Sequence, residues 1–108
     1  MLFYLQMRWN IEGRATLEEV WDMEANEAEV GAKVFKIVAI FKVAGQKRVI
    51  GIVEAESAEA LDRAIFSLPM REYLDFEAIW PLRTFSGYLE DCQTHFGAKP
   101  AALAGSVE

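Results

Sequence analysis

Two glutamates, Glu24 and Glu27, are the side chains whose type and position best suit acid–base chemistry. They lie in a segment that begins near Leu17 and has helical periodicity, with about 100° between successive residues. The apolar positions of this segment form one stripe and are Leu17, Val20, Trp21, Ala28 and Gly31. Glu24 falls close to the centre of the stripe, and Glu27 lies near its margin. Partial desolvation on such a face raises the pKa of a carboxyl group toward the range of a general base.

The same two glutamates also have a purely structural interpretation. In that interpretation their carboxylates reach solvent at the helix edge or pair with Arg or Lys across a sheet. As a catalytic group, Glu24 is expected first and Glu27 second, because periodicity places Glu24 nearer the apolar centre.

Other polar and aromatic side chains are candidates for holding a substrate. The polar row of the first predicted strand consists of Tyr4, Gln6, Arg8 and Asn10. Arg8 can bind a carboxylate with two hydrogen bonds, Trp21 can stack on a substrate ring, and Tyr73 can close one end of a pocket. Alternatively, the polar row forms hydrogen bonds at a dimer interface or faces solvent, and both aromatic residues pack in a core or an interface.

The composition indicates one folded domain and disfavours nucleic-acid-binding and membrane proteins. The chain has 108 residues, of which 53% are hydrophobic and 26% are charged, as expected for one folded domain. Its net charge of -6 disfavours nucleic acid as a partner, because phosphate backbones are also negative. The longest uncharged apolar run, residues 37–41, is far shorter than the ~20 residues of a membrane span. We expect a cytoplasmic protein that binds neither nucleic acid nor membrane.

Cysteine and histidine are too scarce for several kinds of site. Cys92 is the only cysteine and His95 the only histidine, which excludes a disulfide within the chain and a Cys/His metal cluster. A site for Mg or Mn made of carboxylates alone is disfavoured, since no D-x-D type cluster is present. We therefore expect neither a metal nor a cofactor.

Residue patterns predict four strands and two helices. The first half of the chain is predicted to contain a strand over residues 2–11, a helix from Leu17 to a C-terminal cap at Gly31, and a strand over Val34–Val43 that is covered on both faces. A turn over residues 44–47 leads to a strand over Val49–Glu54. The remaining elements are a helix from Ser57 that stops at Pro69 and a strand over Leu74–Leu82. The capping-box pattern Thr16-Leu17-Glu18-Glu19 marks the first helix start. In the last strand, Leu74, Phe76, Ala78, Trp80 and Leu82 are expected on one face.

The order β-α-β-β-α-β is that of an α+β, ferredoxin-like subunit, in which a four-stranded antiparallel sheet carries both helices on one face. The other face would expose apolar residues from the second and third strands, so we expect a second copy of the chain to cover it in a dimeric α+β barrel. We place this domain at residues 1–84. We expect residues 85–108 to form a C-terminal arm or tail, with a short helix or an arm toward a neighbouring subunit over residues 86–96 and a mobile end over residues 97–108.

Several short motifs occur in an order that resembles the muconolactone isomerase family, small enzymes of aromatic catabolism. They are Val53-Glu54 through Ser57, Glu59-Ala60-Leu61, Ser67-Leu68-Pro69, Tyr73-Leu74-Asp75-Phe76-Glu77, Pro81-Leu82, Met1-Leu2-Phe3, Met7 and Asn10-Ile11. The resemblance covers about residues 1–84. It implies a ferredoxin-like subunit in a dimeric barrel, often assembled into larger rings, and cofactor-independent isomerisation of an unsaturated lactone.

The chain also departs from that family. Members with established isomerase activity tend to have His at the position of Tyr4, and a Lys-Trp segment leading into Leu-Trp-Arg where this chain has residues 33–39. The departure removes indole and guanidinium groups suited to a substrate carboxylate. Tyr4 can instead donate a hydrogen bond to a carbonyl or enolate oxygen. An ungapped alignment places the helix glutamate of the family at Glu27.

These observations predict a muconolactone isomerase-like enzyme that catalyses a proton shift on a small unsaturated lactone or a related ring-cleavage acid. A cofactor-free monooxygenase or dehalogenase on the same barrel is the first alternative, because one fold hosts several chemistries. A non-catalytic barrel that binds a small ligand or serves in assembly is the second. The expected partners are a small-molecule substrate and a second copy of the chain, as a homodimer or a higher oligomer.

Overall fold

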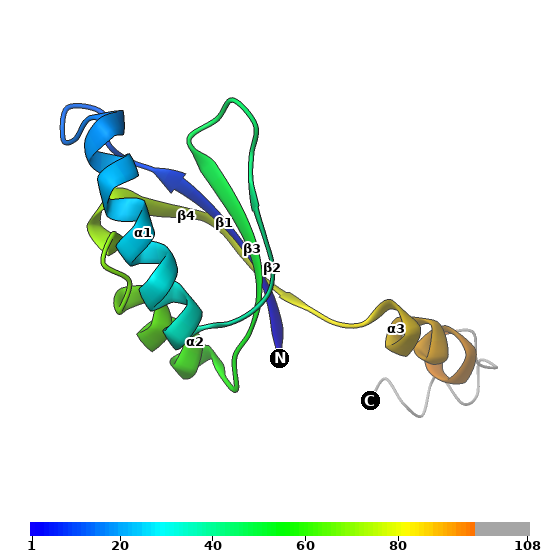
Figure 1. The fold of residues 1–108 in the computed structure, drawn as a ribbon. Coiled ribbons are helices and arrows are strands. Elements are labelled where there is room, and N and C mark those ends of the chain that lie inside the picture. Colours follow the sequence, from blue (N-terminus) through cyan, green and yellow to red (C-terminus); the bar gives the residue numbers. More distant parts are fainter. Residues whose placement is uncertain (97–108) are drawn as a thin grey trace.

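The computed structural model describes residues 1–96 as an α+β fold with a C-terminal helical arm (Figure 1). The elements are β1 (Leu2–Trp9), α1 (Leu17–Val34), β2 (Lys36–Lys42), β3 (Arg48–Glu54), α2 (Ala58–Phe66), the short 3-10 helix η1 (Arg71–Tyr73), β4 (Leu74–Leu82), α3 (Phe85–Asp91) and η2 (Cys92–Phe96). Up to β4 this is the β-α-β-β-α-β order that the sequence predicts.

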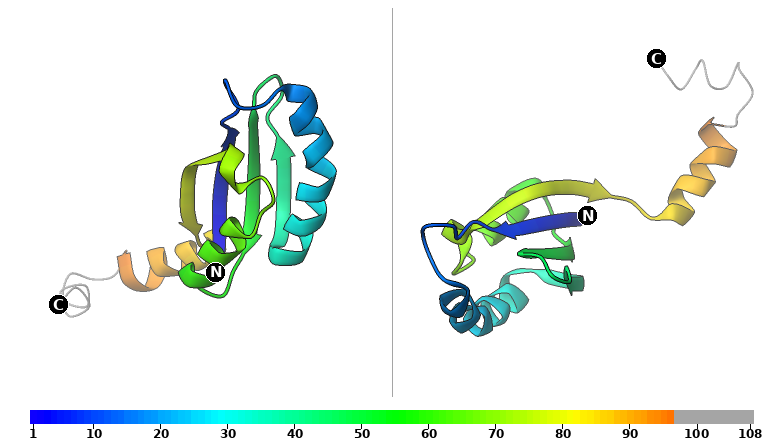
Figure 2. Two further views of the ribbon diagram at one scale, coloured as in Figure 1. Left: turned by 90° about the vertical axis from the view of Figure 1, so that its left-hand side faces the viewer. Right: turned by 90° about the horizontal axis from the view of Figure 1, so that it is seen from above.

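One four-stranded antiparallel sheet, in the order β2-β3-β1-β4, supports the fold. Helices α1 and α2 both lie over the same face of this sheet (Figures 1 and 2). The predicted ferredoxin-like architecture is therefore confirmed. We call the other face, which neither helix covers, the open face; by register it carries Tyr4, Gln6, Arg8, Phe41, Ile50, Ile52 and Trp80.

Strand β1 separates apolar from polar side chains as its alternation predicts, although it ends at Trp9 rather than near residue 11. Phe3 and Leu5 are buried in a cluster with Leu61 and Ile65 of α2. The even-numbered side chains point to the opposite face, because successive side chains of a strand alternate. The period-two pattern thus determines which residues of β1 face the helices.

Strand β4 does not keep one alternation along its length, contrary to the prediction. Its pairing with β1 shifts at Glu77: Gln6 pairs with Ala78 and Met7 pairs with Phe76, so Glu77 has no partner residue in β1. A bulge of this kind reverses the faces beyond it. Phe76 therefore packs with the core, whereas Trp80 lies on the open face opposite Tyr4 and is 58% exposed.

Helix α1 begins where its capping box predicts. The hydroxyl of Thr16 accepts a hydrogen bond from the Glu19 N–H at 3.1 Å, and the Glu19 carboxylate accepts one from the Thr16 N–H at 3.1 Å. The predicted end is wrong, however, because the helix continues to Val34 and Gly31 lies within it. Phe35 is the C-terminal cap, and its N–H donates to the Gly31 carbonyl at 3.0 Å.

The face that α1 turns toward the sheet is rotated from the predicted stripe. Val20 and Gly31 are buried, and Glu24 and Glu27 are half-buried between them. Trp21, expected on this stripe, is 60% exposed. The rotation brings both glutamates toward the interior.

Helix α2 has the N-terminal cap that was predicted, since the Ser57 hydroxyl accepts a hydrogen bond from the Ala60 N–H at 3.1 Å. Its inner face buries Leu61, Ala64 and Ile65 against the sheet. The helix ends at Phe66 rather than at Pro69, and a turn leads from it into η1. Met70, in this turn, is completely buried.

Strand β2 lies at the edge of the sheet and is largely exposed within the protomer. The sequence predicts that this strand is covered on both faces, but within one copy of the chain β2 is not covered on both faces. Phe41 is 62% exposed on the open face. The antiparallel pairing of β2 with β3 through the turn around Gly45, whose φ is +72°, agrees with the predicted hairpin.

After β4 the chain leaves the sheet, and α3 and η2 lie apart from the other elements (Figures 1 and 2). Apolar side chains of this arm are exposed, namely Phe85, Tyr88, Leu89 and Phe96. The segment predicted to be mobile, residues 97–108, lies outside the described residues. No helix over residues 1–96 is long and apolar enough to cross a membrane.

Candidate functional site

A cavity of about 290 Å³ lies between α1 and the sheet. It is lined by Leu5, Met7, Trp9, Glu24, Glu27, Ala28, Gly31, Phe35, Ile37, Ile40, Val49, Gly51, Val53, Leu68 and Leu74. Except for the two glutamates, these side chains are apolar or absent. The cavity therefore places two half-buried carboxyl groups beside an apolar surface that suits an apolar ligand.

Each wall of the cavity comes from a different element. Odd-numbered residues of β1, such as Met7, and neighbouring residues of β3 form the sheet side. Helix α1 forms the opposite side, and Leu68 closes it from the turn after α2. Gly31 contributes no side chain, and a Cβ atom built there would lie 3.8 Å from Leu68 Cδ2. The missing side chain leaves additional space on the helix side.

Glu27 is held by the backbone of the turn after α2. Its Oε1 accepts a hydrogen bond from the Met70 N–H at 3.2 Å. Burial raises the pKa of Glu27, the nearby Glu24 carboxylate raises it further, and the hydrogen bond from Met70 opposes both by favouring the ionised form. Glu27 is thus a partly desolvated carboxyl group that one backbone hydrogen bond orients.

Glu24 lies one turn earlier on the same face of α1 and also lines the cavity. Burial raises its pKa above the ordinary value. The two groups therefore differ in their surroundings, because only Glu27 has a backbone N–H that favours its charge. A pair of carboxyl groups with unequal environments can divide the roles of acid and base.

Tyr4, the predicted hydrogen-bond donor, is not in this cavity. Its ring stacks on Trp80 on the open face, with the ring centroids 5.0 Å apart. Its hydroxyl donates to Gln6 Oε1 at 2.9 Å. Within one protomer the sheet separates Tyr4 from both glutamates.

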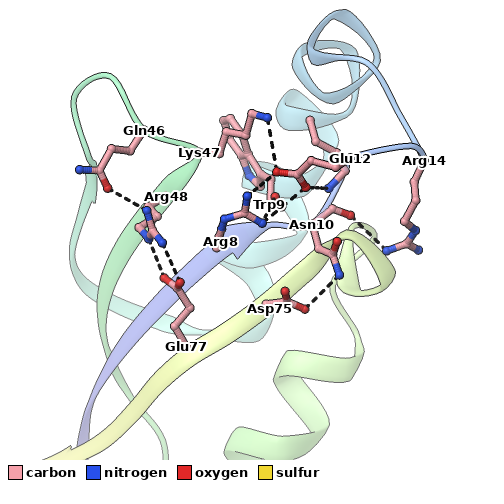
Figure 3. Close-up of polar contacts among 11 residues, drawn as sticks. Arg8, Trp9, Asn10, Glu12, Arg14, Gln46, Lys47, Arg48, Asp75 and Glu77 are labelled. Carbon is pink, nitrogen blue, oxygen red and sulfur yellow. Dashed lines mark hydrogen bonds and ion pairs between the residues drawn. The ribbon is translucent and has the colours of Figure 1, made fainter.

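Arg8, the predicted carboxylate binder, also lies on the side of the sheet away from the cavity. Its guanidinium forms an ion pair with Glu12 and donates to the Trp9 carbonyl at 3.3 Å (Figure 3). Nearby, Arg48 pairs with Glu77 at 2.8 Å, and Gln6 donates to the same carboxylate at 3.0 Å. These bonds fit the alternative interpretation of the polar row, in which it is a network of satisfied hydrogen bonds.

The two aromatic candidates are outside the cavity lining as well. Trp21 is not among the residues that line the cavity, and its side chain is exposed. Tyr73 packs against the buried cluster that contains Trp9 and Val20, and the Arg14 guanidinium lies 4.9 Å from the centre of its ring. Of the predicted site residues, the structure brings only Glu24 and Glu27 together.

Two contributors to the site are not among the predicted site residues. Trp9 lies on the helix-facing side of β1, where it is buried in the core and also lines the cavity. The Met70 N–H had no sequence signal, because a backbone donor 43 residues away from Glu27 is found only once the chain is folded. Over residues 1–96, no group of three or more His, Cys, Asp or Glu side chains is arranged to hold a metal ion.

Comparison with known proteins agrees with the geometry. A family model described as Muconolactone delta-isomerase matches residues 1–87. The chain is similar to a solved crystal structure of muconolactone isomerase at 3.3 Å resolution, with a TM-score of 0.63 and 23% identity over 80% of this chain and 93% of that one. A comparison with curated protein sequences found no match. Because the family model spans most of its length and the fold agrees, the chain belongs to the muconolactone delta-isomerase family.

Proposed function

We propose that this protein catalyses a cofactor-independent 1,3-proton shift on a small unsaturated lactone or a related ring-cleavage acid. The observation that carries the proposal is the pair of half-buried carboxyl groups, Glu24 and Glu27, in a cavity that is otherwise apolar. Membership of an isomerase family supports the reaction class. The cavity therefore offers acid–base groups and an apolar lining for a ring.

Glu27 is the better general base of the two. The Met70 N–H favours its ionised form and fixes Oε1, which leaves Oε2 to meet the substrate. Burial raises the pKa of both carboxyl groups, and only Glu27 is held in one orientation by a backbone donor, so geometry selects Glu27 as the group that faces the substrate. We assign the base to Glu27 and the acid to Glu24, the reverse of the order expected from periodicity.

In the proposed reaction, the Glu27 carboxylate removes the proton from the γ carbon of an α,β-unsaturated lactone. The electron pair of that C–H bond moves into the conjugated system and places negative charge on the carbonyl oxygen. The Glu24 carboxyl group donates a hydrogen bond to this oxygen. Glu27 then returns the proton to the α carbon, which gives the β,γ-unsaturated isomer without net oxidation or reduction.

Proton exchange in D2O tests this assignment. We expect the wild type to incorporate deuterium at the α and γ positions of muconolactone or an uncharged butenolide, as followed by NMR. A general base contributes about 10²–10⁴-fold, so Glu27→Gln should lower the rate by that range. Glu24→Gln keeps an N–H donor and should cost less, about tenfold or more. Glu29→Gln, an exposed charge removal on the same helix, should leave the rate unchanged.

Two results would contradict the proposed function. One is a wild type that exchanges no proton of either ligand. The other is a double variant, Glu24→Gln with Glu27→Gln, that keeps the full rate. Binding without exchange would instead support a non-catalytic ligand-binding protein, the alternative left open by the sequence.

We further propose that a second copy of the chain covers the open face, forming a dimeric α+β barrel. Phe41 and Trp80 are each more than half exposed there, and Ile50 and Ile52 lie between them on the same face. Monomeric proteins rarely leave so large a contiguous apolar patch in water. Pairing two open faces would remove both patches from solvent.

A further inference from the structure

The cavity is acidic, and none of the residues 1–96 that line it is basic. Its only ionisable side chains are Glu24 and Glu27. Two arginines are close in sequence to residues that line the cavity, but both side chains have other partners. Arg8 forms an ion pair with Glu12, and Arg71 donates a hydrogen bond to the Leu68 carbonyl at 3.1 Å.

The Lys42 ammonium lies 5.5 Å from the centre of the Trp9 ring, but it donates to the backbone carbonyls of Val43 and Gln46 and does not line the cavity. Among residues 1–96, a ligand carboxylate in this cavity would therefore meet two lining carboxyl groups and no lining cation.

We propose that the substrate of this site is uncharged: a neutral unsaturated lactone or cyclic enone without a free carboxylate. This inference rests on the proposed function, because it assumes that the two glutamates act on the ligand. It narrows that function, since it selects the neutral lactone over the ring-cleavage acid.

The number of negative charges in the cavity during the reaction favours an uncharged substrate. With a neutral substrate, the Glu27 carboxylate carries one negative charge, and proton transfer only moves that charge to the carbonyl oxygen of the ligand. With an acid substrate, a second negative charge would stay in the same apolar space throughout. An unpaired buried charge is strongly disfavoured, and a like charge nearby makes it worse.

The size and lining of the cavity agree with a small apolar ring. Its volume of about 290 Å³ is roughly twice the ~150 Å³ of an apolar cavity that binds benzene. Leu5, Trp9 and Leu68 offer apolar surface to such a ring on several sides. The site therefore has room for a five- or six-membered ring with a short uncharged substituent.

A matched ligand pair tests the inference directly. Muconolactone and its primary carboxamide have nearly the same shape but differ in charge at pH 7.5. Binding is measured by calorimetry and by the change in tryptophan fluorescence, to which Trp9 in the cavity lining contributes. We expect the amide to bind at least about tenfold more tightly than the acid. Glu24→Gln should reduce this preference, because it removes one acidic group from the cavity.

A variant with an added cation makes the test independent of the glutamates. Ile40 lines the cavity but is 56% exposed, so a longer polar side chain is tolerated there. We expect Ile40→Lys to tighten acid binding about tenfold and to change amide binding less than about twofold. Ile40→Met is the matched control for side-chain length, and any change in affinity that it causes should be the same for the acid and the amide.

The possible outcomes separate the inference from the proposed function. Equal or tighter binding of the acid by the wild type overturns the inference, whereas deuterium exchange of either ligand still supports the proposed function. Preferential amide binding without exchange overturns the proposed function and supports charge selection by the cavity. Failure to bind either ligand overturns both.

Discussion

The carboxylate of Glu27 is joined to the backbone of Met70 by a 3.2 Å hydrogen bond that spans from α1 to the turn after α2. Met70 is completely buried and Glu27 is half-buried, so this bond is partly shielded from competition with water. It links the two helices at the cavity wall and fixes the orientation of one carboxyl group. The catalytic geometry that we propose therefore depends on a main-chain contact as well as on side-chain identity.

The first prediction concerns pH and Glu24. Because burial raises its pKa above 4.5, the folded protein holds this proton more tightly than the unfolded chain does. The free energy of unfolding should therefore fall as pH rises from about 4.5 through the raised pKa, and the penalty should stay constant above it. Glu24→Gln should be more stable than wild type at pH 8 and similar to it at pH 4. Urea unfolding at both pH values measures this difference.

A control for this pH dependence is the exposed Glu29 on the same helix. Glu29→Gln also removes one negative charge, but that charge is exposed to solvent rather than half-buried. Its stability difference from wild type should vary much less with pH than that of Glu24→Gln. Parallel pH profiles for wild type and Glu24→Gln would contradict the desolvated position of Glu24.

The second prediction concerns Gly31, which lies inside α1. Gly31→Ala should stabilise the protein by about 0.5–1 kcal/mol, because alanine loses less backbone entropy in a helix. The added Cβ has room, at 3.8 Å from Leu68 Cδ2, but it takes space from the cavity. Thermal unfolding and titration with the lactone amide should show higher stability and weaker binding together. Ala25→Gly, on the exposed face of α1, measures the helix effect alone and should destabilise without changing ligand affinity.

The third prediction concerns self-association through the open face. Phe41 and Phe66 are almost equally exposed, at 62% and 65%, but only Phe41 lies on the open face. Phe41→Asp should therefore convert dimer to monomer in sedimentation velocity at micromolar concentration, whereas Phe66→Asp should not. A wild type that sediments as a monomer, or equal behaviour of the two variants, would contradict the proposed dimeric barrel.

The fourth prediction concerns the ion pair between Glu77 and Arg48 (Figure 3). Hydrogen bonds from Arg48 and Gln6 lower the pKa of Glu77 from 4.5 to about 2. The stabilisation from this carboxylate should be present above about pH 4.5 and be lost as pH falls through about 2. NMR titration of the Glu77 side chain measures its midpoint. Arg48→Gln should move that midpoint upward, and an unshifted midpoint would argue against the pair.

Local signals in the sequence were sufficient for much of the fold. Thr16 and Ser57 marked the helix starts because capping depends only on residues three positions away. The alternation of β1 identified its inner face, and the order of elements gave the sheet and both helices. The bulge at Glu77 was not predictable in this way, because the apolar alternation of β4 continues through it and only pairing with β1 reveals the extra residue.

For the site, the sequence by itself determined that Glu24 and Glu27 lie near the apolar face of a helix, since spacing along one helix is a local property. Only the tertiary structure decided which way α1 turns, and therefore that both glutamates point inward while Trp21 is exposed. It also decided that the sheet separates Tyr4 and Arg8 from the cavity and that the Met70 N–H reaches Glu27. Such contacts join residues far apart in the chain, and packing of whole elements fixes them rather than any local pattern.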